Sequence, residues 1–178
     1  MKVLILKDRN NKLIKSILKG SKQKVRPEAI CYYNQAVYVT DGMRALKIDS
    51  DFFSFDFQPE DNKMYDIVSQ SNNKPGVMYY LEESCNSVPN FDGVFPTEEN
   101  KRKLFPCQID SDIIANNVII NIFKAVGCGL RYDFVKDLIS NDNEVIYVYG
   151  KDDSKPILFE YTGSAFLVMP YKIKCYAV

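Results

Sequence analysis

The chain opens on a pattern that predicts a strand followed by an amphipathic helix. Residues 2–7 are a short, mostly apolar run typical of a strand, and a turn-like segment at 8–11 follows. Between residues 11 and 19 the apolar positions recur at helical spacing, and Gly20 is a typical stop signal. The face expected in the core carries Leu13, Ile14, Ile17 and Leu18. Another face carries Lys12, Lys15 and Lys19, so the helix has a core side and a cationic side.

Three strand-like runs follow this helix. Residues 29–33 and 36–40 flank Asn34-Gln35, a two-residue spacing typical of a tight hairpin. Asp41-Gly42 predicts a turn before a further strand at 44–48. The first fifty residues therefore predict the element order β-α-β-β-β.

The same order recurs towards the C-terminus. Residues 118–126 are apolar and β-rich, and runs at 144–149, 156–161 and 165–173 predict three strands joined by turn residues. Between them, Asp133 is placed to cap a short helix whose apolar residues are Phe134, Val135, Leu138 and Ile139. Two arms of the same order predict a pseudo-duplicated α+β domain, with two helices packed on a curved antiparallel sheet.

The segment between the two arms has a less regular pattern. Residues 64–70 fit a helix, 76–81 are typical of a strand, and the proline-punctuated stretch 89–106 indicates irregular structure. We therefore expect one domain over residues 1–178. Its first arm is at about 1–55, its central insertion-like segment at about 56–116, and its second arm at about 117–178.

Composition places the chain among ordered globular proteins, with 46% apolar and 13% aromatic residues. No run is long enough for a membrane span and the opening run is too short for a secretion signal, so we expect a cytoplasmic protein with no membrane partner.

The cysteines show no Cys-x-x-Cys spacing, and we interpret them as reduced structural thiols rather than a disulfide framework or zinc site. They are Cys31, Cys85, Cys107, Cys128 and Cys175.

Charge changes the picture at the N-terminus. The net charge is zero, yet the first 26 residues hold nine basic residues against Asp8 alone, which gives +8 there and −8 over the remainder. Such a basic face can bind phosphates even on a neutral protein. The alternative is an ordinary solvated helix face.

The sequence nominates no catalytic or metal-binding set. It contains no histidine, the commonest general base and metal ligand. Gly127-Cys128-Gly129 lacks the pattern of a phosphate loop, and Asp49-Ser50-Asp51 and Asp110-Ser111-Asp112 lack the spacing of a calcium loop. We expect no enzyme, no metal and no cofactor. An enzyme with an unfamiliar acid or thiol site is the remaining alternative in that class.

Three separated segments resemble the bacterial DNA polymerase III β sliding clamp. Residues 36–46, Ala-Val-Tyr-Val-Thr-Asp-Gly-Met-Arg-Ala-Leu, are similar to a strand that ends in Thr-Asp-Gly-His-Arg-Leu-Ala in that family. Residues 88–96, Val-Pro-Asn-Phe-Asp-Gly-Val-Phe-Pro, are similar to the clamp linker Phe-Pro-Asp-Tyr-x-x-Val-Leu-Pro. Residues 165–173, Ala-Phe-Leu-Val-Met-Pro-Tyr-Lys-Ile, are similar to the closing strand Tyr-Val-Val-Met-Pro-Met-Arg-Leu. The resemblance covers residues 1–50 and 88–174.

In clamps these three segments line a hydrophobic pocket that receives short linear motifs of polymerase, clamp-loader and repair proteins. The resemblance implies such a pocket here, in which methionine adapts to the partner and proline fixes one wall. Arg44 and the backbone around Gly42 are expected to orient the bound peptide. The implied peptide-binding residues are Thr40, Gly42, Met43, Arg44, Leu46, Pro89, Val94, Val168, Met169, Pro170 and Tyr171.

The resemblance also gives the basic helix a role, because clamps line their channel with helices whose cations face double-stranded DNA. The implied DNA-binding residues are Lys12, Lys15, Lys19, Lys22 and Lys24. A bacterial clamp chain has three such domains and closes as a dimer, so this shorter chain would need to form a homo-oligomer to encircle DNA.

Two hypotheses follow. The first is a clamp-like protein that docks peptides of replication or repair proteins and contacts the DNA backbone as an oligomer. The second is an interaction module or regulator that keeps the clamp fold and the pocket but does not bind DNA.

Overall fold

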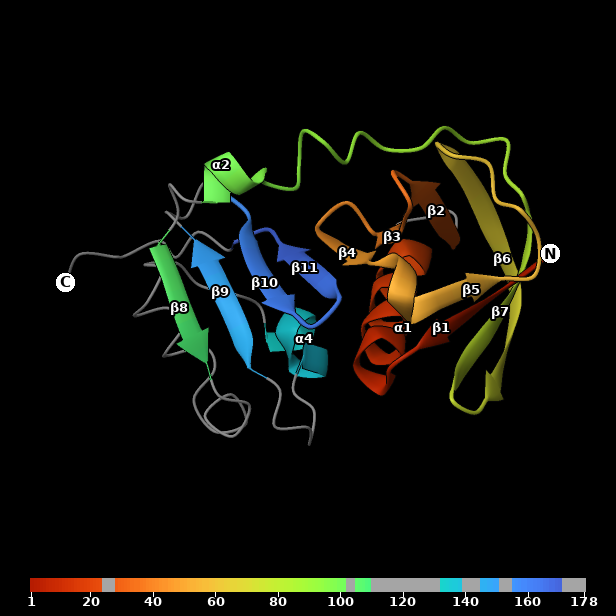
Figure 1. Cartoon of the computed structure of the whole chain (residues 1–178), viewed down its shortest axis with the longest axis horizontal. Helices are drawn as coiled ribbons and strands as arrows, with labels where there is room; N and C mark the ends of the chain where they lie inside the picture. The colour runs from red at the N-terminus through yellow and green to blue at the C-terminus, as the bar shows by residue number, and fades with distance from the viewer. Residues whose placement is uncertain (24–27, 102–104, 110–131, 139–144, 151–154, 171–178) are drawn as a thin grey trace. The chain divides into compact units, whose positions relative to one another are not determined.

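The computed structural model describes residues 1–23, 28–101, 105–109, 132–138, 145–150 and 155–170 (Figure 1). The chain divides into two compact units. The first unit is Met1–Asn90 with Gly163–Ala165, and the second is Phe91–Thr162 with Phe166–Val178. Each unit is described by itself. The organisation of residues 1–178 as one domain stays a prediction.

The first unit has one long helix and a set of antiparallel strands. Its elements are β1 (Lys2–Leu6), α1 (Asp8–Gln23), β2 (Ala29–Tyr33), β3 (Ala36–Thr40), β4 (Arg44–Ile48), η1 (Ser50–Phe52), β5 (Phe53–Phe55), β6 (Lys63–Asn73) and β7 (Gly76–Glu83). The strands follow the order β5-β1-β7-β6-β2-β3-β4, and each neighbouring pair is antiparallel. The predicted order β-α-β-β-β of the first fifty residues is confirmed.

The β2–β3 hairpin shows how closely local sequence determines a turn. Asn34 and Gln35 both have positive φ, at 48° and 58°, which is the backbone of the tight hairpin turns that match strand twist. Cys31 pairs with Tyr38 and Tyr33 with Ala36 across the two strands. The predicted hairpin is therefore confirmed.

Two expectations for this unit are wrong. Helix α1 begins at Asp8 rather than after the expected turn at 8–11, and Arg9 and Asn10 of that segment are buried in its first turn. The helix also continues past Gly20 and ends at Gln23. Residues 64–70 are not helical but belong to β6. That strand is paired on one side with β2 and on the other with β7, so its conformation is decided by partners distant in sequence.

The sheet of the first unit curves around α1. The helix contacts β1 and β7 as well as β3 and β4, although β1 and β4 stand five places apart in the strand order. In a flat sheet that separation would be about 24 Å, roughly twice the diameter of a helix. Aromatic contacts agree, because the ring of Tyr32 on β2 lies 6.2 Å from Phe53 and 5.5 Å from Phe55 on β5.

The core of the first unit lies between the inner sheet face and α1. Val3 on β1 stands opposite both Phe55 and Tyr79, so three strands contribute to the same face. The apolar side of α1 closes this core, as its sequence pattern predicts. The four residues of that side are all buried: Leu13, Ile14, Ile17 and Leu18.

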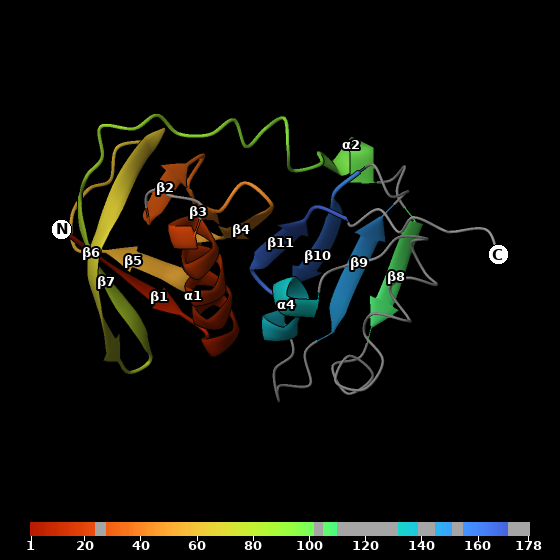
Figure 2. The same cartoon turned by 180° about the vertical axis from the view of Figure 1, so that it is seen from behind.

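The second unit is a smaller antiparallel arrangement. Its elements are α2 (Glu98–Lys101), β8 (Phe105–Ile109), α4 (Tyr132–Val135), η2 (Lys136–Leu138), β9 (Ile146–Gly150), β10 (Ile157–Tyr161) and β11 (Ser164–Val168). The order is β11-β10-β9-β8, and the first two residues of β11 belong to the first unit (Figure 2).

Most predictions for the second arm agree with this unit. The three expected strands are β9, β10 and β11, although the last ends at Val168, before Pro170. The helix expected from Asp133 is α4 with η2, in which Val135 and Leu138 are buried. The irregular structure expected over 89–106 is wrong in part, since α2 and the start of β8 lie there. The strand expected at 118–126 and residue Ile139 lie outside the described residues.

Candidate functional site

The turn between β3 and β4, residues Thr40–Arg44, has a backbone held by its own side chains. Oδ1 of Asp41 accepts hydrogen bonds from the backbone N–H groups of Met43 and Arg44, at 2.8 and 2.9 Å. Oγ1 of Thr40 accepts from the N–H of Gly42 at 3.0 Å and donates to the carbonyl of Arg44 at 2.7 Å. Gly42 has φ of 81°, a conformation that glycine adopts without steric cost. The turn is thus fixed in one conformation.

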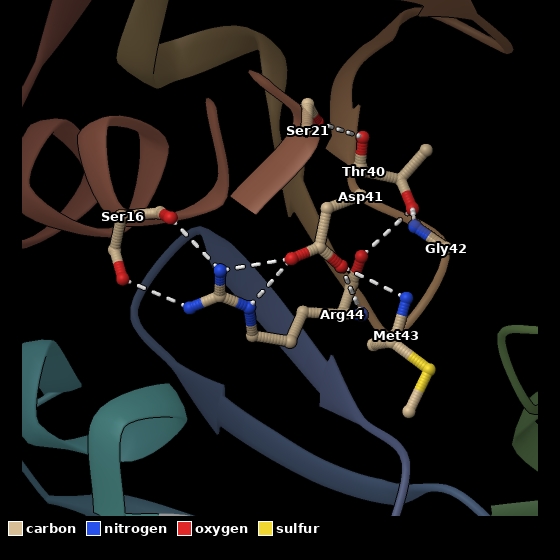
Figure 3. Close-up of polar contacts among 7 residues, drawn as sticks. All are labelled: Ser16, Ser21, Thr40, Asp41, Gly42, Met43 and Arg44. Atoms are coloured by element: carbon tan, nitrogen blue, oxygen red, sulfur yellow. Dashed lines mark hydrogen bonds and ion pairs between the residues drawn. The ribbon is translucent and has the colours of Figure 1, made fainter. Parts of the chain in front are cut away.

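A buried ion pair ties this turn to α1 (Figure 3). Nε and Nη2 of Arg44 donate to Oδ2 of Asp41 at 3.1 and 2.9 Å. The same guanidinium donates to the hydroxyl and the carbonyl of Ser16, both at 2.8 Å. The side chains of Arg44 and Asp41 are only 3% and 1% exposed. A second link is the hydroxyl of Ser21, which donates to the carbonyl of Thr40 at 3.2 Å.

Gly20 makes room for this ion pair. A Cβ at position 20 would run into the carboxylate of Asp41 and would lie 2.9 Å from Nη2 of Arg44. The glycine is therefore a packing residue inside α1 rather than the helix stop expected from the sequence. It allows the helix backbone to approach the charged pair closely.

Arg44 has a different role from the one predicted. A peptide-orienting arginine needs free donors at the surface, but this guanidinium is buried and bonded to Asp41 and Ser16. Arg44 positions the turn instead. Leu46 is likewise fully buried in the core rather than lining a surface. What the turn exposes is the backbone at Gly42 and the side chain of Met43, which is 40% exposed.

Thr40 and Pro89, two of the predicted peptide-binding residues, line the same small pocket of about 220 Å³. Cys31 also lines it. Burial, and secondarily the nearby charge of Asp66, raises the pKa of the Cys31 thiol to about 12. The thiol is therefore protonated at neutral pH and is not a nucleophile there. Cys85 is also a free cysteine, as the interpretation of the cysteines as reduced thiols expects, but it is exposed rather than packed in the core.

The remaining predicted pocket residues belong to the second unit. Val94 and Met169 are exposed by 44% and 36%, whereas Val168 is fully buried in the core. Pro170 is half-buried, and Tyr171 lies outside the described residues. Because these residues and the Thr40–Arg44 turn fall in separate units, the three-sided pocket stays a prediction.

The cationic side of α1 is confirmed as an exposed surface. Lys12, Lys15 and Lys19 are exposed, opposite the buried apolar side. Lys12 lies 2.6 Å from the carboxylate of Asp8, one turn earlier. Arg9, which the charge count includes, is buried and does not belong to this surface. The side chain of Lys22 and the whole of Lys24 lie outside the described residues.

The sequence predicts no metal site and no membrane span, and both predictions concern the described residues. Among them, no group of three or more histidine, cysteine, aspartate or glutamate side chains is arranged to hold a metal ion. Asp49 forms an ion pair with Lys47 at 3.4 Å, while residues 110–112 lie outside the described residues. Within the same described ranges, no helix has the length and apolarity needed to cross a bilayer.

Sequence reasoning missed the turn of the β6–β7 hairpin, which is a candidate functional element. Lys74 and its neighbours Asn72 and Asn73 stand beside the cationic side of α1 and line a cleft with it. The helical interpretation of residues 64–70 hid this hairpin. The signal that could have found it is the run Asn-Asn-Lys-Pro-Gly at 72–76, which is typical turn chemistry between two strand-like segments.

Comparison with known proteins identifies the fold. No family model matches the chain, and no curated protein matches its sequence. The structure is similar to the Helicobacter pylori beta clamp bound to a DNA ligase peptide, at 9% identity and a TM-score of 0.53, over 96% of this chain and 65% of that one. It is also similar to the Borrelia burgdorferi DNA polymerase III subunit beta, at 9% identity and a TM-score of 0.56, over 97% and 64%.

A third similar structure is the Caulobacter crescentus polymerase III beta, at 12% identity and a TM-score of 0.53, over 96% of this chain and 66% of that one. The expected α+β, clamp-like fold is therefore confirmed. The chain spans about 65% of the length of the clamp chains that it matches.

Proposed function

We propose that this chain is a non-enzymatic, clamp-like binding protein that docks short linear peptides and contacts the DNA backbone. The observation that supports it most is the exposure of apolar side chains at predicted docking positions of a clamp-like fold: Met43, Val94 and Met169. Among the described residues only four other large hydrophobic side chains are comparably exposed. One of the similar clamps was solved with a bound DNA ligase peptide.

The apolar contacts are suited to a peptide with one or two hydrophobic anchors. Methionine is flexible and polarizable, so Met43 and Met169 can adapt to different partner side chains. Burying a leucine or phenylalanine anchor contributes roughly 1.5–3 kcal/mol, from which the cost of ordering the peptide is subtracted. Two such anchors supply about 3–6 kcal/mol before that cost, and a micromolar Kd corresponds to about 8 kcal/mol. Backbone hydrogen bonds and further contacts therefore have to supply the rest if the peptide binds with micromolar affinity.

The DNA contact rests on the exposed side of α1. Lys12, Lys15 and Lys19 lie on one face of a helix whose other face is buried, so their ammonium groups are held at the surface. Lysines in this arrangement bind phosphates without reading base sequence. Encircling DNA would in addition require self-assembly into a homo-oligomer.

A second candidate is an interaction module or regulator that keeps the fold and the docking surface without binding DNA. The short helix of the second unit favours it, because Lys136 there is paired with Asp133 at 3.6 Å and adds no net charge. Among the described residues, α1 thus carries a surface rich in lysine, and α4 with η2 does not. Light scattering that finds a strict monomer, together with no salt-sensitive DNA binding, would support this candidate.

The peptide half is tested by titrating a labelled peptide of Gln-Leu-x-Leu-Phe type against the wild type, Met169→Ala and Val68→Ala. Val68 is 59% exposed on β6 and lies outside the predicted docking residues, so it controls for loss of any exposed apolar side chain. We expect Met169→Ala to weaken binding about tenfold, or 1.4 kcal/mol, and Val68→Ala to have no effect. Absence of wild-type binding at high micromolar peptide contradicts the proposal.

A further inference from the structure

A cleft of about 590 Å³ lies between the first turns of α1 and the turn of the β6–β7 hairpin. Both walls belong to the first unit, and Figure 1 shows the two segments at the same edge of it. The volume is within the range of roughly 300–1,000 Å³ that is usual for ligand pockets. We call this the α1–hairpin cleft; its lining residues are Asp8, Asn11, Lys12, Lys15 and 72–77.

Gly76 explains why the hairpin turn stands beside the helix. It pairs with Leu6 at the end of β1, and a Cβ at position 76 would meet the carbonyl oxygen of Ile5. Only glycine lets β7 begin this close to the backbone of β1. Because α1 follows β1 after a single residue, this close approach places Lys74 next to the start of the helix.

The cleft carries a net positive charge. Lys12, Lys15 and Lys74 face one carboxylate, that of Asp8, so the balance is +2. Within the described part of the chain, no carboxylate lies within ion-pair distance of Lys15 or Lys74. The pair of Lys12 with Asp8 has side chains 46% and 77% exposed, and such pairs contribute at most about 1 kcal/mol. A bound anion can therefore replace Asp8 as the partner of Lys12.

The neutral polar side chains of the cleft are of two kinds: one is hydrogen-bonded within the protein, and two are exposed and can donate to a ligand. The carboxamide nitrogen of Asn11 donates to the carbonyls of Ile5 and Lys7 at 3.0 and 2.9 Å, and its oxygen accepts from the hydroxyl of Tyr79 at 3.1 Å. Asn11 is thus fully engaged and holds the helix start in place. Asn72 and Asn73 are exposed at the hairpin turn, where their amide groups can donate to a ligand.

From this geometry we infer that the α1–hairpin cleft binds a phosphodiester group of the nucleic-acid backbone. Lys12, Lys15 and Lys74 supply the charge, and the amides of Asn72 and Asn73 supply hydrogen bonds. The cleft contains lysines and no arginine, so it presents point charges rather than the planar fork that recognises a carboxylate or a guanine edge. The inference rests on the proposed DNA contact and adds the hairpin as a second contacting element.

The test is the salt dependence of binding to a labelled DNA duplex, measured by fluorescence anisotropy between 50 and 200 mM salt. Each phosphate contact contributes about 0.9 to the slope of log K against log salt. We expect Lys74→Gln to lower the slope by about that amount and to weaken binding up to roughly eightfold at 0.1 M salt. Lys74→Arg should restore the slope, because it keeps the charge.

The matched control is Lys47→Gln, which removes the same charge from β4 of the same unit, outside the cleft. Equal slopes for Lys74→Gln and Lys47→Gln, with wild-type DNA binding intact, overturn the cleft and leave the proposed DNA contact standing. Absence of wild-type DNA binding at 50 mM salt overturns both. A nuclear magnetic resonance titration with inorganic pyrophosphate gives a second readout: amide shifts at Asn72 and Asn73 that persist unchanged in Lys74→Gln would also overturn the cleft.

Discussion

Helix α1 supports two surfaces of opposite character. Its second half, at Ser16 and Gly20, holds the buried ion pair of Arg44 with Asp41. Its first half presents Lys12 and Lys15 to solvent beside the β6–β7 turn. At the Thr40–Arg44 turn the polar groups bind one another and an apolar side chain is exposed. At the α1–hairpin cleft the lysines and the two asparagines of the hairpin turn are exposed to water, and only Asn11 is buried and bonded within the protein.

This difference separates charges that set positions from the charges that we propose to bind ligands. A buried ion pair cannot lose one partner without leaving the other charge desolvated, so it fixes geometry strongly. An exposed lysine contributes little to stability and can exchange its partner. The residues that contact ligands should therefore be those whose replacement affects folding least, and the following substitutions test that rule from the largest expected effect to the smallest.

The largest effect is expected when the buried pair is broken. Arg44→Met leaves Asp41 charged and without its partner in the interior, which should lower the free energy of unfolding by about 3–5 kcal/mol in urea titrations. Lys47→Met breaks an ion pair with Asp49 whose side chains are 37% and 53% exposed, and should cost less than about 1 kcal/mol. Similar losses for the two variants would remove the distinction between positioning and binding charges.

An intermediate effect is expected where α1 meets the pair. Gly20→Ala adds a Cβ against Asp41 and Arg44, and such overpacking costs about 1–3 kcal/mol. The gain in helix propensity of up to about 1 kcal/mol offsets only part of it. We expect net destabilisation in the same urea titration. Stabilisation by Gly20→Ala would mean that the glycine has no packing role.

A smaller effect on folding is expected at the exposed tip of the turn. Met43→Ala removes a side chain that is 40% exposed, so stability should change by no more than about 0.5 kcal/mol. Peptide affinity should nevertheless fall about tenfold, as measured by anisotropy of a labelled peptide. Loss of stability without loss of peptide affinity would assign Met43 to the core.

The smallest effect on folding is expected in the cleft. Lys12→Gln breaks the helical pair with Asp8, which contributes only about 0.3–0.5 kcal/mol. Thermal unfolding should show a nearly unchanged midpoint, while the salt slope for duplex DNA should decrease by about 0.9. A large drop in the midpoint with an unchanged slope would make Lys12 a structural residue.

Local patterns predicted the parts of the fold that depend on neighbours in sequence. The buried side of α1 follows from helical spacing, and the hairpin at Asn34-Gln35 follows from two turn residues between two strand-like runs. Strand β6 was missed because its conformation depends on pairing with β2 and β7 at the same time. The turn residues at 72–76 mark where this strand ends, but the pairing that makes residues 64–70 extended is not contained in their local pattern.

In the candidate site, too, some residues could be predicted from local sequence and others could not. Exposure of Met43 and Met169 agrees with the expectation that they are surface residues, and so does that of the lysines on α1. The burial of Arg44 could not be predicted, because its partners Asp41 and Ser16 come together only when α1 crosses the turn. The packing role of Gly20 could not be predicted either, because it depends on the same contact with Asp41 and Arg44. In the sequence alone, a glycine after a helical pattern is typical of a helix end.

One crossed experiment tests most directly whether the protein has two separate binding surfaces. The affinities of Met169→Ala and Lys15→Gln are measured for a labelled peptide of Gln-Leu-x-Leu-Phe type and for a labelled DNA duplex. We predict that Met169→Ala weakens peptide binding about tenfold and leaves DNA binding unchanged, and that Lys15→Gln lowers DNA affinity and its salt slope by about 0.9 while leaving peptide binding unchanged. The existence of two separate binding surfaces would be contradicted by either of two results. One is that the wild type does not bind the peptide at high micromolar concentration, and the other is that each variant loses affinity for the peptide and for DNA equally.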